Sequence, residues 1–201
     1  MPVSDLQTAG RQQLREEFRA RRRELTPTRR IQGAQALAAR LLALPFAPSS
    51  GPVAGYWATD GEVALHAWQV QLPEQCTYCL PVLHADHRLR FAPWRPGEAL
   101  RSNRFGIPEP DVDADRLLDA AAMSLVVVPL VAFDTRGNRL GMGGGWYDRS
   151  FAFRQHQSAP PWLVGAGFAE QHIERIKPAL WDVPLDAVCS DAASFDYRPS
   201  A

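Results

Sequence analysis

Apolar residues recur along the chain with two different periods, which predict alternating helices and strands. From about Asp5 to Glu24, the apolar side chains fall near one stripe of a helix. A second helix is expected to begin with Thr26 as its N-cap and Pro27 in its first turn, and to stop before Pro45. We also predict strands over 52–58, 76–83, 88–93, 124–133, 162–168 and 186–191. Shorter helices are expected over 116–122, 146–156 and 169–176, and a turn followed by a helix over 61–72.

This order of elements predicts an α/β fold, a three-layer α/β/α arrangement around a mostly parallel, Rossmann-like sheet. The almost unbroken apolar run at 124–133 fits a strand that is covered on both faces. With 201 residues and no internal repeat, the chain is expected to form one domain over 1–201. Ligands of such sheets bind beyond the carboxyl ends of the strands.

The overall charge balance argues against two classes of partner. The formal net charge is zero, which disfavours binding to nucleic acid or to a membrane surface. No apolar run approaches the roughly 20 residues that a membrane-spanning helix needs. The N-terminal stretch is charged and lacks the apolar core of a secretory signal. We therefore expect a cytoplasmic protein, and we expect it to be a monomer.

Two short motifs resemble metal or redox sites but are expected to be structural. Cys76 and Cys79 lie in the predicted strand 76–83, where residues three apart face opposite ways, so we expect core thiols. His84 and His87 form H-x-x-H in a polar loop. The zincin pattern requires H-E-x-x-H, so we expect these histidines at the surface.

The most unusual stretch is RLGMGGGWYDR at 139–149, which holds four glycines within five positions. It matches neither the Walker A loop nor the dinucleotide fingerprint G-x-G-x-x-G. Glycines lack a Cβ atom, so successive N–H groups can turn toward one anion, and the following helix adds its dipole. Because Lys177 is the single lysine of the chain, phosphate binding would depend on arginine, backbone N–H groups and a metal.

Charged and aromatic side chains flank these glycines. Arg139 and Arg149 suit phosphate oxygens, Asp148 is a hard oxygen ligand for magnesium, and Trp146 and Tyr147 offer flat faces to a flat ligand. We therefore favour a polyphosphate site. The alternative is structural, with the glycines in a tight turn, the aspartate as a helix cap and the aromatic rings in the core.

The N-terminal region is rich in arginine. Arg11 and Arg15 are four residues apart and share one face of the first predicted helix. A solvated face with local ion pairs explains most of the arginines that follow, up to Arg30. Contact with RNA is disfavoured by the neighbouring glutamates and the zero net charge.

The segment VVVPLVAFDTRGNRLGMGGGWYDRSF at 126–151 resembles the signature of the 5-formyltetrahydrofolate cyclo-ligases, also called 5,10-methenyltetrahydrofolate synthetases. That signature reads roughly P-G-x-A-F-D-x-x-G-x-R-L-G-x-G-x-G-Y-Y-D-R. The stretches RQQLREEFRARRREL, GEVAL, FGIPEP and WDVPLDAVCSD are similar to further family segments. The resemblance therefore extends over nearly the whole chain.

The resemblance implies an enzyme that uses ATP and Mg²⁺ to close the formyl group of 5-formyltetrahydrofolate onto the neighbouring nitrogen. The products would be 5,10-methenyltetrahydrofolate, ADP and phosphate. It also implies a three-layer α/β/α fold, in agreement with the predicted order of elements. Two alternatives stay open: an enzyme of related architecture that acts on sugar phosphates or coenzyme A esters, and a folate- or nucleotide-binding module without catalysis.

The resemblance also implies roles for particular residues. Arg139 and Tyr147 would be catalytic, and Asp148 and Asp182 would hold magnesium. The nucleotide would be bound by Arg11, Gln12, Gln13, Leu14, Arg15, Arg139, Leu140, Gly141, Met142, Gly143, Gly144, Gly145, Trp146 and Tyr147. The folate would be bound by Trp57, Glu62, Met142, Gly143, Gly144, Gly145 and Trp146.

The chain departs from the family pattern at three positions. Arg11 replaces the usual lysine, which keeps the charge but changes a point charge into a planar fork. Trp146 replaces the first tyrosine of the Tyr-Tyr pair, which keeps a stacking surface and loses a hydroxyl. Leu130 replaces the usual glycine after the proline.

Overall fold

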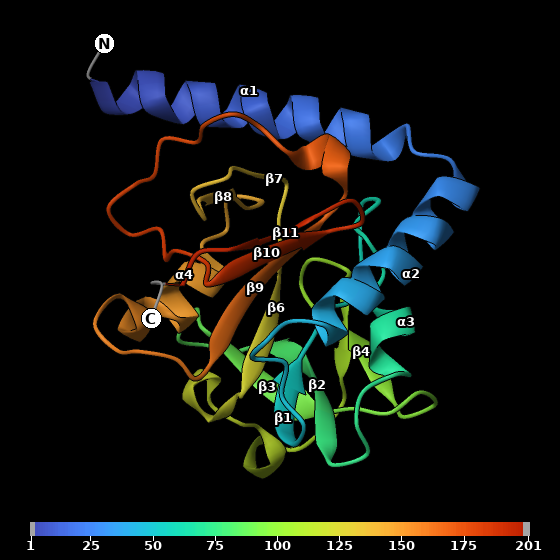
Figure 1. The fold of residues 1–201 in the computed structure, drawn as a ribbon. Helices are drawn as coiled ribbons and strands as arrows, with labels where there is room; N and C mark the ends of the chain where they lie inside the picture. Colours follow the sequence, from blue (N-terminus) through green and yellow to red (C-terminus); the bar gives the residue numbers. More distant parts are fainter. Residues whose placement is uncertain (1–2, 199–201) are drawn as a thin grey trace.

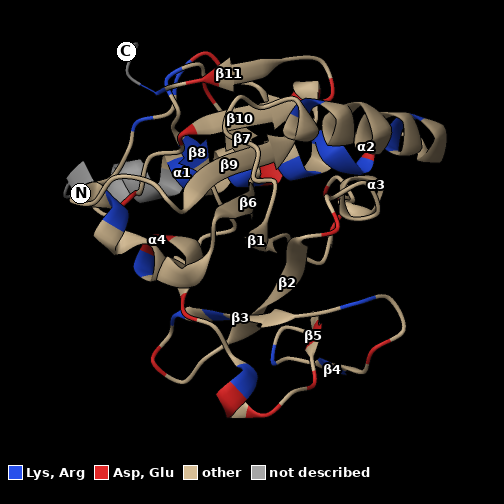
Figure 2. Ribbon diagram, turned by 60° about the horizontal axis from the view of Figure 1, so that its bottom comes forward, with Lys and Arg blue, Asp and Glu red and all other residues tan. Residues whose placement is uncertain are grey.

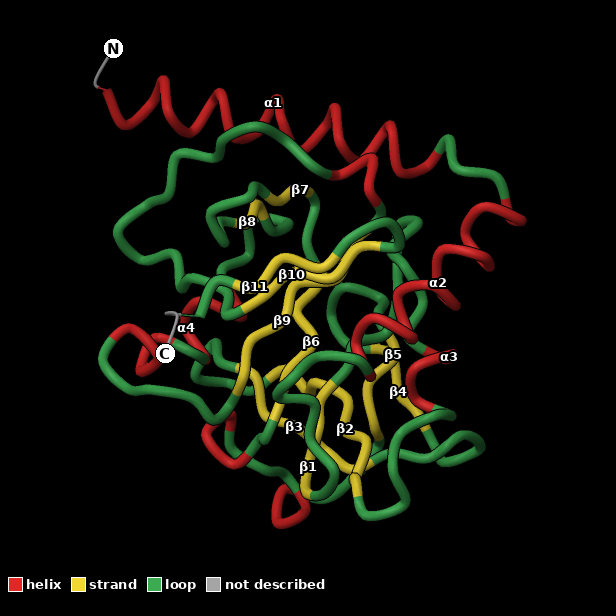
Figure 3. Tube along the Cα trace, in the orientation of Figure 1, coloured by secondary structure: helices red, strands yellow, loops and turns green. Residues whose placement is uncertain are grey.

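The computed structural model describes residues 3–198. Its helices and strands are drawn in Figures 1 and 3. The helices are α1 (Val3–Arg23), α2 (Pro27–Leu42), α3 (His66–Gln69) and α4 (Trp146–Ser150), with 3-10 helices η1 (Ala114–Arg116), η2 (Ala120–Ala122), η3 (Ala152–Gln155) and η4 (Ala169–Gln171). The strands are β1 (Gly51–Ala54), β2 (Cys76–Leu83), β3 (Leu89–Pro93), β4 (Leu100–Ser102), β5 (Pro108–Pro110), β6 (Leu125–Pro129), β7 (Ala132–Phe133), β8 (Arg139–Leu140), β9 (Trp162–Gly167), β10 (Ala187–Ser190) and β11 (Ser194–Asp196).

Seven strands form one sheet in the order β11-β10-β9-β6-β1-β2-β3. The neighbours from β10 to β2 are parallel, whereas the edge strands β11 and β3 are antiparallel to their partners. This arrangement confirms the predicted α/β fold with a mostly parallel sheet. The strand order reverses between β1 and β6, because β2 follows β1 on one side and β6 pairs on the other. Such a reversal marks the place where open α/β sheets bind ligands.

Alternate residues of β6 face two different cores. Leu125 and Val127 belong to a cluster that includes Trp68 of α3 and several residues of α2. Val126 and Val128 belong to a second cluster on the opposite face, together with aromatic residues near α4. The central strand is therefore covered on both faces, as predicted, but it ends at Pro129. The last residues of the strand predicted over 124–133 instead form β7, which pairs with β8 in a separate sheet.

The two long helices lie where the sequence predicted them. Thr26 caps α2, and its hydroxyl accepts a hydrogen bond from the Arg29 N–H at 3.2 Å. In Figure 1, α1 crosses the end of the sheet at which β7 and β8 lie. Phe18 of α1 is buried there against Val131 and Leu140. Helix α1 thus forms a wall over one end of the sheet.

The shorter predicted helices are wrong in extent, and non-local pairing explains two of them. In place of a helix over 169–176, only η4 is helical, because the backbone then pairs with β7: the Ile173 N–H donates to Phe133. In place of a helix over 116–122, η1 and η2 flank Leu118, which pairs with Phe91 of β3. In both places, backbone N–H and C=O groups form hydrogen bonds with a strand that is distant in the sequence. In a helix the same groups would bond to residues four positions away.

Two further helices are shorter than predicted. A turn and a helix were predicted over 61–72, and the turn at Asp60 and Gly61 is followed by a helix that is only α3; Val63 and Leu65 are buried in the core before it begins. Helix α4 ends at Ser150, whose hydroxyl donates to the Trp146 carbonyl at 2.7 Å and accepts from the Leu89 N–H at 2.7 Å. Serine competes in this way with the helical backbone. The hairpin β4–β5 and the edge strand β11 were not predicted.

The cysteines confirm the prediction made for them. Cys79 is buried in the cluster that holds Val126, whereas Cys76 packs against the cluster that holds Leu125. The two thiols are free and face opposite sides of the sheet.

Charges of both signs are interspersed over the ribbon in Figure 2. Among residues 3–198, no helix has the length and apolar character needed to cross a bilayer.

Two helical glycines allow a matched test of packing. A Cβ atom on Gly10 of α1 would meet nothing within 4 Å, whereas one on Gly33 of α2 would lie 2.7 Å from the buried Phe168 ring. Gly10→Ala is expected to raise the free energy of unfolding by about 1 kcal/mol through helix propensity. Gly33→Ala is expected to lower it, because overpacking costs about 1–3 kcal/mol and exceeds the same gain. Urea unfolding of both variants measures this, and equal stabilisation by both would contradict the packing described for α2.

Candidate functional site

A cavity of about 880 Å³ lies at the carboxyl ends of the parallel strands β1, β2 and β6. Its wall includes Trp57 just after β1, Leu83 at the end of β2 and Pro129 at the end of β6. The cavity therefore lies at the point where the strand order reverses, between β1 and β6. Among the predicted site residues, the cavity is lined by Arg11, Arg15, Trp57, Glu62, Arg139, Gly141, Met142, Gly143, Gly144, Gly145, Trp146, Tyr147, Asp148 and Asp182.

The glycine stretch between β8 and α4 forms one wall of the cavity. Gly143 has φ +97° and Gly145 has φ +64°, and residues other than glycine rarely adopt such positive φ angles. The Arg15 Nε–H donates to the Gly141 carbonyl at 2.9 Å. A Cβ atom on Gly143 would lie 3.3 Å from the Arg15 guanidinium carbon. The bare backbone therefore lets a guanidinium group of α1 lie directly against the loop.

Two arginines of α1 make this end of the cavity positive. Arg11 donates to Asp182 at 2.9 Å and to the Lys177 carbonyl at 3.2 Å. Burial and the neighbouring Arg11 lower the pKa of Arg15. Two guanidinium groups and the N–H groups of a glycine loop in one corner favour a polyanion, which relieves their mutual repulsion.

Arg139 is buried at the same end, with 8% of its surface exposed. One of its terminal nitrogens donates to Asp148 at 2.6 Å, and the other donates to the Val183 carbonyl. Asp148 also accepts from the Val183 N–H at 3.2 Å. Arg139 and Asp148 thus tie the glycine stretch to the segment that carries Asp182.

Arg149 does not bracket the anion site as its position in the sequence suggested. Its guanidinium donates to the carbonyls of His87 and Gly144, both at 2.8 Å, and it does not line the cavity. These bonds hold the outer side of the glycine stretch. Arg149 therefore supports the loop from behind.

A buried carboxylate marks the other end of the cavity. Glu62 accepts from the Thr59 N–H at 2.9 Å, and its side chain is 9% exposed. Burial raises the pKa of Glu62, and burial together with the charge of Glu62 raises the pKa of Tyr147 and of Tyr56. The Tyr147 hydroxyl therefore stays protonated as a donor. A carboxylate with one hydrogen-bonded oxygen and an adjacent phenol suits a ligand edge that carries N–H groups.

Aromatic side chains line the space between the two ends. Trp57 is 37% exposed and meets Trp94 edge to face, with ring centroids 5.8 Å apart. Trp146 is flanked by two cations, with the guanidinium carbon of Arg104 at 5.0 Å and that of Arg149 at 5.4 Å from its ring. These contacts fix the indole that replaces the family's tyrosine.

The sequence did not identify several residues of the wall. Tyr56 precedes the predicted Trp57. Phe105 and Ile107 lie in FGIPEP, which resembles a family segment but was given no site residue. Trp181, which is 70% exposed, neighbours the predicted Asp182. The signal in the sequence that could have identified Trp181 was an aromatic residue directly beside a predicted metal ligand.

Four predicted nucleotide contacts lie off the cavity wall. Gln12 and Gln13 are exposed on α1, and Gln12 bonds Glu16 within the helix. Leu14 and Leu140 pack in the cluster beneath α1. A helix presents only one face to a ligand, so Arg11 and Arg15 reach the cavity and the residues between them do not.

The predicted magnesium ligands lie in the same cavity but are engaged in ion pairs. Asp148 pairs with Arg139 at 2.6 Å, and Asp182 pairs with Arg11 at 2.9 Å. No group of three or more His, Cys, Asp or Glu side chains suitable for a metal occurs in the described part of the chain. Magnesium bound to a nucleotide needs only one or two carboxylates, because phosphates and waters complete its shell. The donor set therefore fits a metal that arrives with a polyphosphate.

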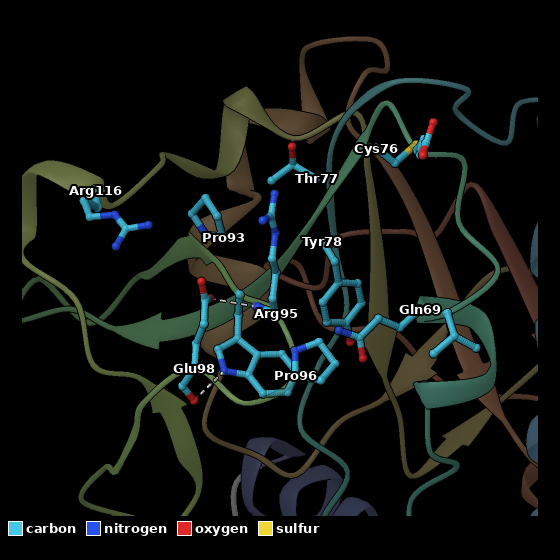
Figure 4. A pocket seen from close by; sticks show the side chains of 12 residues that line it. Gln69, Cys76, Thr77, Tyr78, Pro93, Arg95, Pro96, Glu98 and Arg116 are labelled. Carbon is cyan, nitrogen blue, oxygen red and sulfur yellow. Dashed lines mark hydrogen bonds between the residues drawn. The ribbon is translucent and has the colours of Figure 1, made fainter.

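A second, smaller cavity of about 490 Å³ lies beyond the Trp57–Trp94 contact. Figure 4 shows Tyr78, Arg95 and Arg116 around it. Its residues include none of the predicted site residues. It is therefore separate from the cavity that joins the glycine stretch to Glu62.

The fold and the cavity define an α/β protein whose cavity suits a polyanion at one end and a ligand with polar N–H groups at the other. The sequence model of the 5-formyltetrahydrofolate cyclo-ligase family matches residues 7–191. The 5-formyltetrahydrofolate cyclo-ligase of Haemophilus influenzae is 37% identical over 183 residues, which cover 90% of this chain and 97% of that protein. The Escherichia coli K12 protein of the same name is 36% identical over 184 residues, covering 90% and 100%.

Two solved structures share the fold of this chain. The NMR structure of Aquifex aeolicus 5,10-methenyltetrahydrofolate synthetase matches with a TM-score of 0.79 and 26% identity, covering 95% of this chain and 94% of that one. The Mycoplasma pneumoniae 5,10-methenyltetrahydrofolate synthetase has the same fold, with a TM-score of 0.68 at 19% identity, covering 90% and 98%. The chain belongs to the 5-formyltetrahydrofolate cyclo-ligase family, a family of ligase-type enzymes.

Two glycines with nearly the same backbone angle allow a matched test of the anion corner. Gly143 has φ +97° and Gly97 has φ +96°, but a Cβ atom on Gly97 would meet nothing within 4 Å. Alanine costs roughly 1–2 kcal/mol of backbone strain at either position. We expect Gly143→Ala alone to weaken binding of inorganic tripolyphosphate, because its methyl group displaces Arg15. Calorimetric titration of both folded variants checks this, and equal affinities would contradict the contact between Arg15 and the loop.

Proposed function

We propose that the protein catalyses the ATP- and magnesium-dependent cyclisation of 5-formyltetrahydrofolate to 5,10-methenyltetrahydrofolate, with release of ADP and phosphate. The observation that carries this proposal is the single cavity that joins the arginine-rich glycine stretch to the buried Glu62. One end suits a polyphosphate and the other suits a pterin. Family membership supports the same assignment.

The nucleotide binds with its phosphates against the glycine stretch 141–145. The backbone there approaches Arg15 closely, and Arg11 and Arg139 line the same part of the cavity. Phosphate oxygens compete with the carboxylates of Asp182 and Asp148 for these guanidinium groups. Arginine can bind a phosphate by two parallel hydrogen bonds, which a lysine cannot.

The folate binds at the other end. Glu62 accepts hydrogen bonds from the N–H groups of the pterin, and Trp57 provides an apolar wall. Tyr147 lines the same cavity as Glu62 and Arg139, and its hydroxyl would serve both ligands. Its protonated state suits donation to the formyl oxygen or to the phosphoryl group that this oxygen receives.

The reaction requires an oxygen atom to leave the formyl carbon. The formyl oxygen attacks the γ-phosphorus atom of ATP, and the bond to ADP breaks, which gives an iminium phosphate. The neighbouring nitrogen then attacks the formyl carbon, loses its proton, and the C–O bond breaks with release of phosphate. No protein nucleophile is required, so the protein contributes alignment and neutralisation of charge.

Magnesium would be held by Asp148, with Asp182 as the second carboxylate of the cavity. When bound, it would neutralise the charge of the phosphates. Asp148 becomes available to the metal when phosphate oxygens replace it as the partner of the Arg139 guanidinium group. The ion pairs of the free protein therefore keep both partners fixed in the cavity until substrates arrive.

The first functional test follows methenyl product by its absorbance, with ATP present and with ATP omitted. We expect product only with ATP, and we expect Arg139→Ala to lower turnover by about 10³–10⁵, as arginines facing a transferring phosphoryl group do. Arg154→Ala is the matched control, because the Arg154–Asp186 pair is as buried as Arg139–Asp148 but lies off the cavity. Its folded fraction should turn over normally.

Three outcomes oppose the proposal. Folate binding without product would favour a binding module, and phosphate release that is independent of folate would favour an enzyme of sugar phosphates or coenzyme A esters. A folded Arg139→Ala variant with a near-normal rate would remove Arg139 from the chemistry.

The proposed metal site has its own test. Asp148→Asn keeps the size of the side chain and an acceptor oxygen but removes the negative charge that binds Mg²⁺. We expect it to weaken Mg²⁺ affinity in the presence of ATP, measured by calorimetric titration with a non-hydrolysable analogue. Asp186→Asn, which breaks the Arg154 pair outside the cavity, serves as the control. Unchanged Mg²⁺ affinity in Asp148→Asn would exclude the assigned role.

A further inference from the structure

The turn that carries Glu62 is held from outside the cavity. Its central residues, Asp60 and Gly61, both have positive φ, +50° and +77°, and the Glu62 N–H donates to the Thr59 carbonyl at 2.9 Å. Positive φ at both central positions is the geometry of a type I′ turn. Aspartate tolerates the left-handed region better than most residues do but does not prefer it. Contacts of the Asp60 side chain therefore have to hold the turn.

Three arginines of α1 supply these contacts. Asp60 pairs with Arg19 at 2.6 Å, with Arg22 at 3.1 Å and with the more exposed Arg23. Asp60 lies 38 residues from Arg22 in the sequence, so the cluster joins α1 to a distant turn. This cluster is at the opposite end of α1 from Arg11.

Arg22 differs from the other two because its guanidinium group also contacts the carboxylate of Glu62. Its side chain is fully buried, and its Nη1 lies 3.8 Å from a carboxylate oxygen of Glu62. The same guanidinium donates to the Asp60 carbonyl at 3.0 Å and to the Leu130 carbonyl at 3.3 Å. A buried guanidinium with these partners is held in one orientation.

The position of Arg22 matters for the charge of Glu62. Burial disfavours the ionised carboxylate, and Asp60 adds a second negative charge nearby. Tyr56 and Tyr147, the other titratable groups near it, are neutral phenols whose pKa values its charge raises. The hydrogen bonds from Thr59 oppose these effects, and Arg22 is the cation that also opposes them at Glu62.

We propose that Arg22 is a positioning residue for substrate recognition, which holds the Glu62 carboxylate ionised and turned toward the pterin. This inference rests on the folate-binding role proposed for Glu62. It assigns two roles to α1: Arg11 and Arg15 reach the phosphate end of the cavity, and Arg22 acts at the folate end through Glu62. Arg22 does not line the cavity and so does not contact the substrate itself.

Arg22→Gln and Arg19→Gln form a matched pair for the test. Both remove a guanidinium group from the same Asp60 oxygen, but only Arg22 also contacts Glu62. The equilibrium Kd values for 5-formyltetrahydrofolate and for ATP are measured for each, with Glu62→Gln and the double variant Arg22→Gln/Glu62→Gln alongside. Quenching of tryptophan fluorescence reports folate binding, because Trp57 and Trp146 line the cavity.

We expect Arg22→Gln to raise the folate Kd by about tenfold or more. That loss corresponds to weakening one hydrogen bond between the pterin and the charged Glu62 carboxylate. Its ATP Kd should stay at the wild-type value, and Arg19→Gln should leave both values unchanged. The double variant should bind folate no more weakly than Glu62→Gln alone, because Arg22 acts only through Glu62. Arg22→Lys, which keeps the charge without the fork, should give an intermediate folate Kd, and it takes the place of Arg22→Gln if that variant does not fold.

The proposal is overturned if Arg19→Gln weakens folate binding as much as Arg22→Gln, if the losses from Arg22→Gln and Glu62→Gln multiply, or if Arg22→Lys binds folate with wild-type affinity. Failure of the proposed folate site looks different, because the wild-type protein would then not bind 5-formyltetrahydrofolate. Failure of catalysis alone would appear as folate binding without product, and it would leave the comparison of Kd values intact.

Discussion

Ion pairs between α1 and two distant segments hold the walls of the cavity in place. At one end Arg11 pairs with Asp182, and at the other Arg22 and its neighbours pair with Asp60. Between them in the sequence, Phe18 of α1 is buried in one cluster with Leu140. Buried or half-buried guanidinium groups need such partners, because removing one of them leaves an uncompensated charge that costs several kcal/mol. The position of α1 is therefore fixed by charge as well as by apolar burial.

Under the proposed function, the same pairing prepares the cavity for anionic ligands. In the free protein, carboxylates of Asp148 and Asp182 occupy the guanidinium groups of Arg139 and Arg11. A polyphosphate offers these groups equivalent oxygens, and the released carboxylates are then available to the cation that accompanies it. Because the single lysine of the chain lies outside the glycine stretch, the proposed phosphate binding depends on arginine and on backbone N–H groups.

Local patterns predicted the elements whose causes are local. The strand Cys76–Leu83 and the capped start of α2 at Pro27 follow from apolar runs and capping residues, and the structure has both. The helix expected over 169–176 failed because Ile173 satisfies its backbone on Phe133, a partner 40 residues away. The glycine stretch and Glu62 were identified through their chemistry and the family resemblance. By contrast, nothing local indicated that Arg22 contacts Glu62 or that Arg149 points outward to His87, because these contacts depend on how the chain returns to itself.

The central claim is that one cavity binds a nucleotide and a folate side by side. A crystal structure of the protein with a non-hydrolysable ATP analogue and 5-formyltetrahydrofolate tests it most directly. The account predicts the triphosphate on the N–H groups of residues 141–145 beside Arg15, with the pterin against Glu62 and the formyl oxygen facing the terminal phosphate. A nucleotide bound elsewhere, or a folate that occupies the glycine stretch itself, would contradict it.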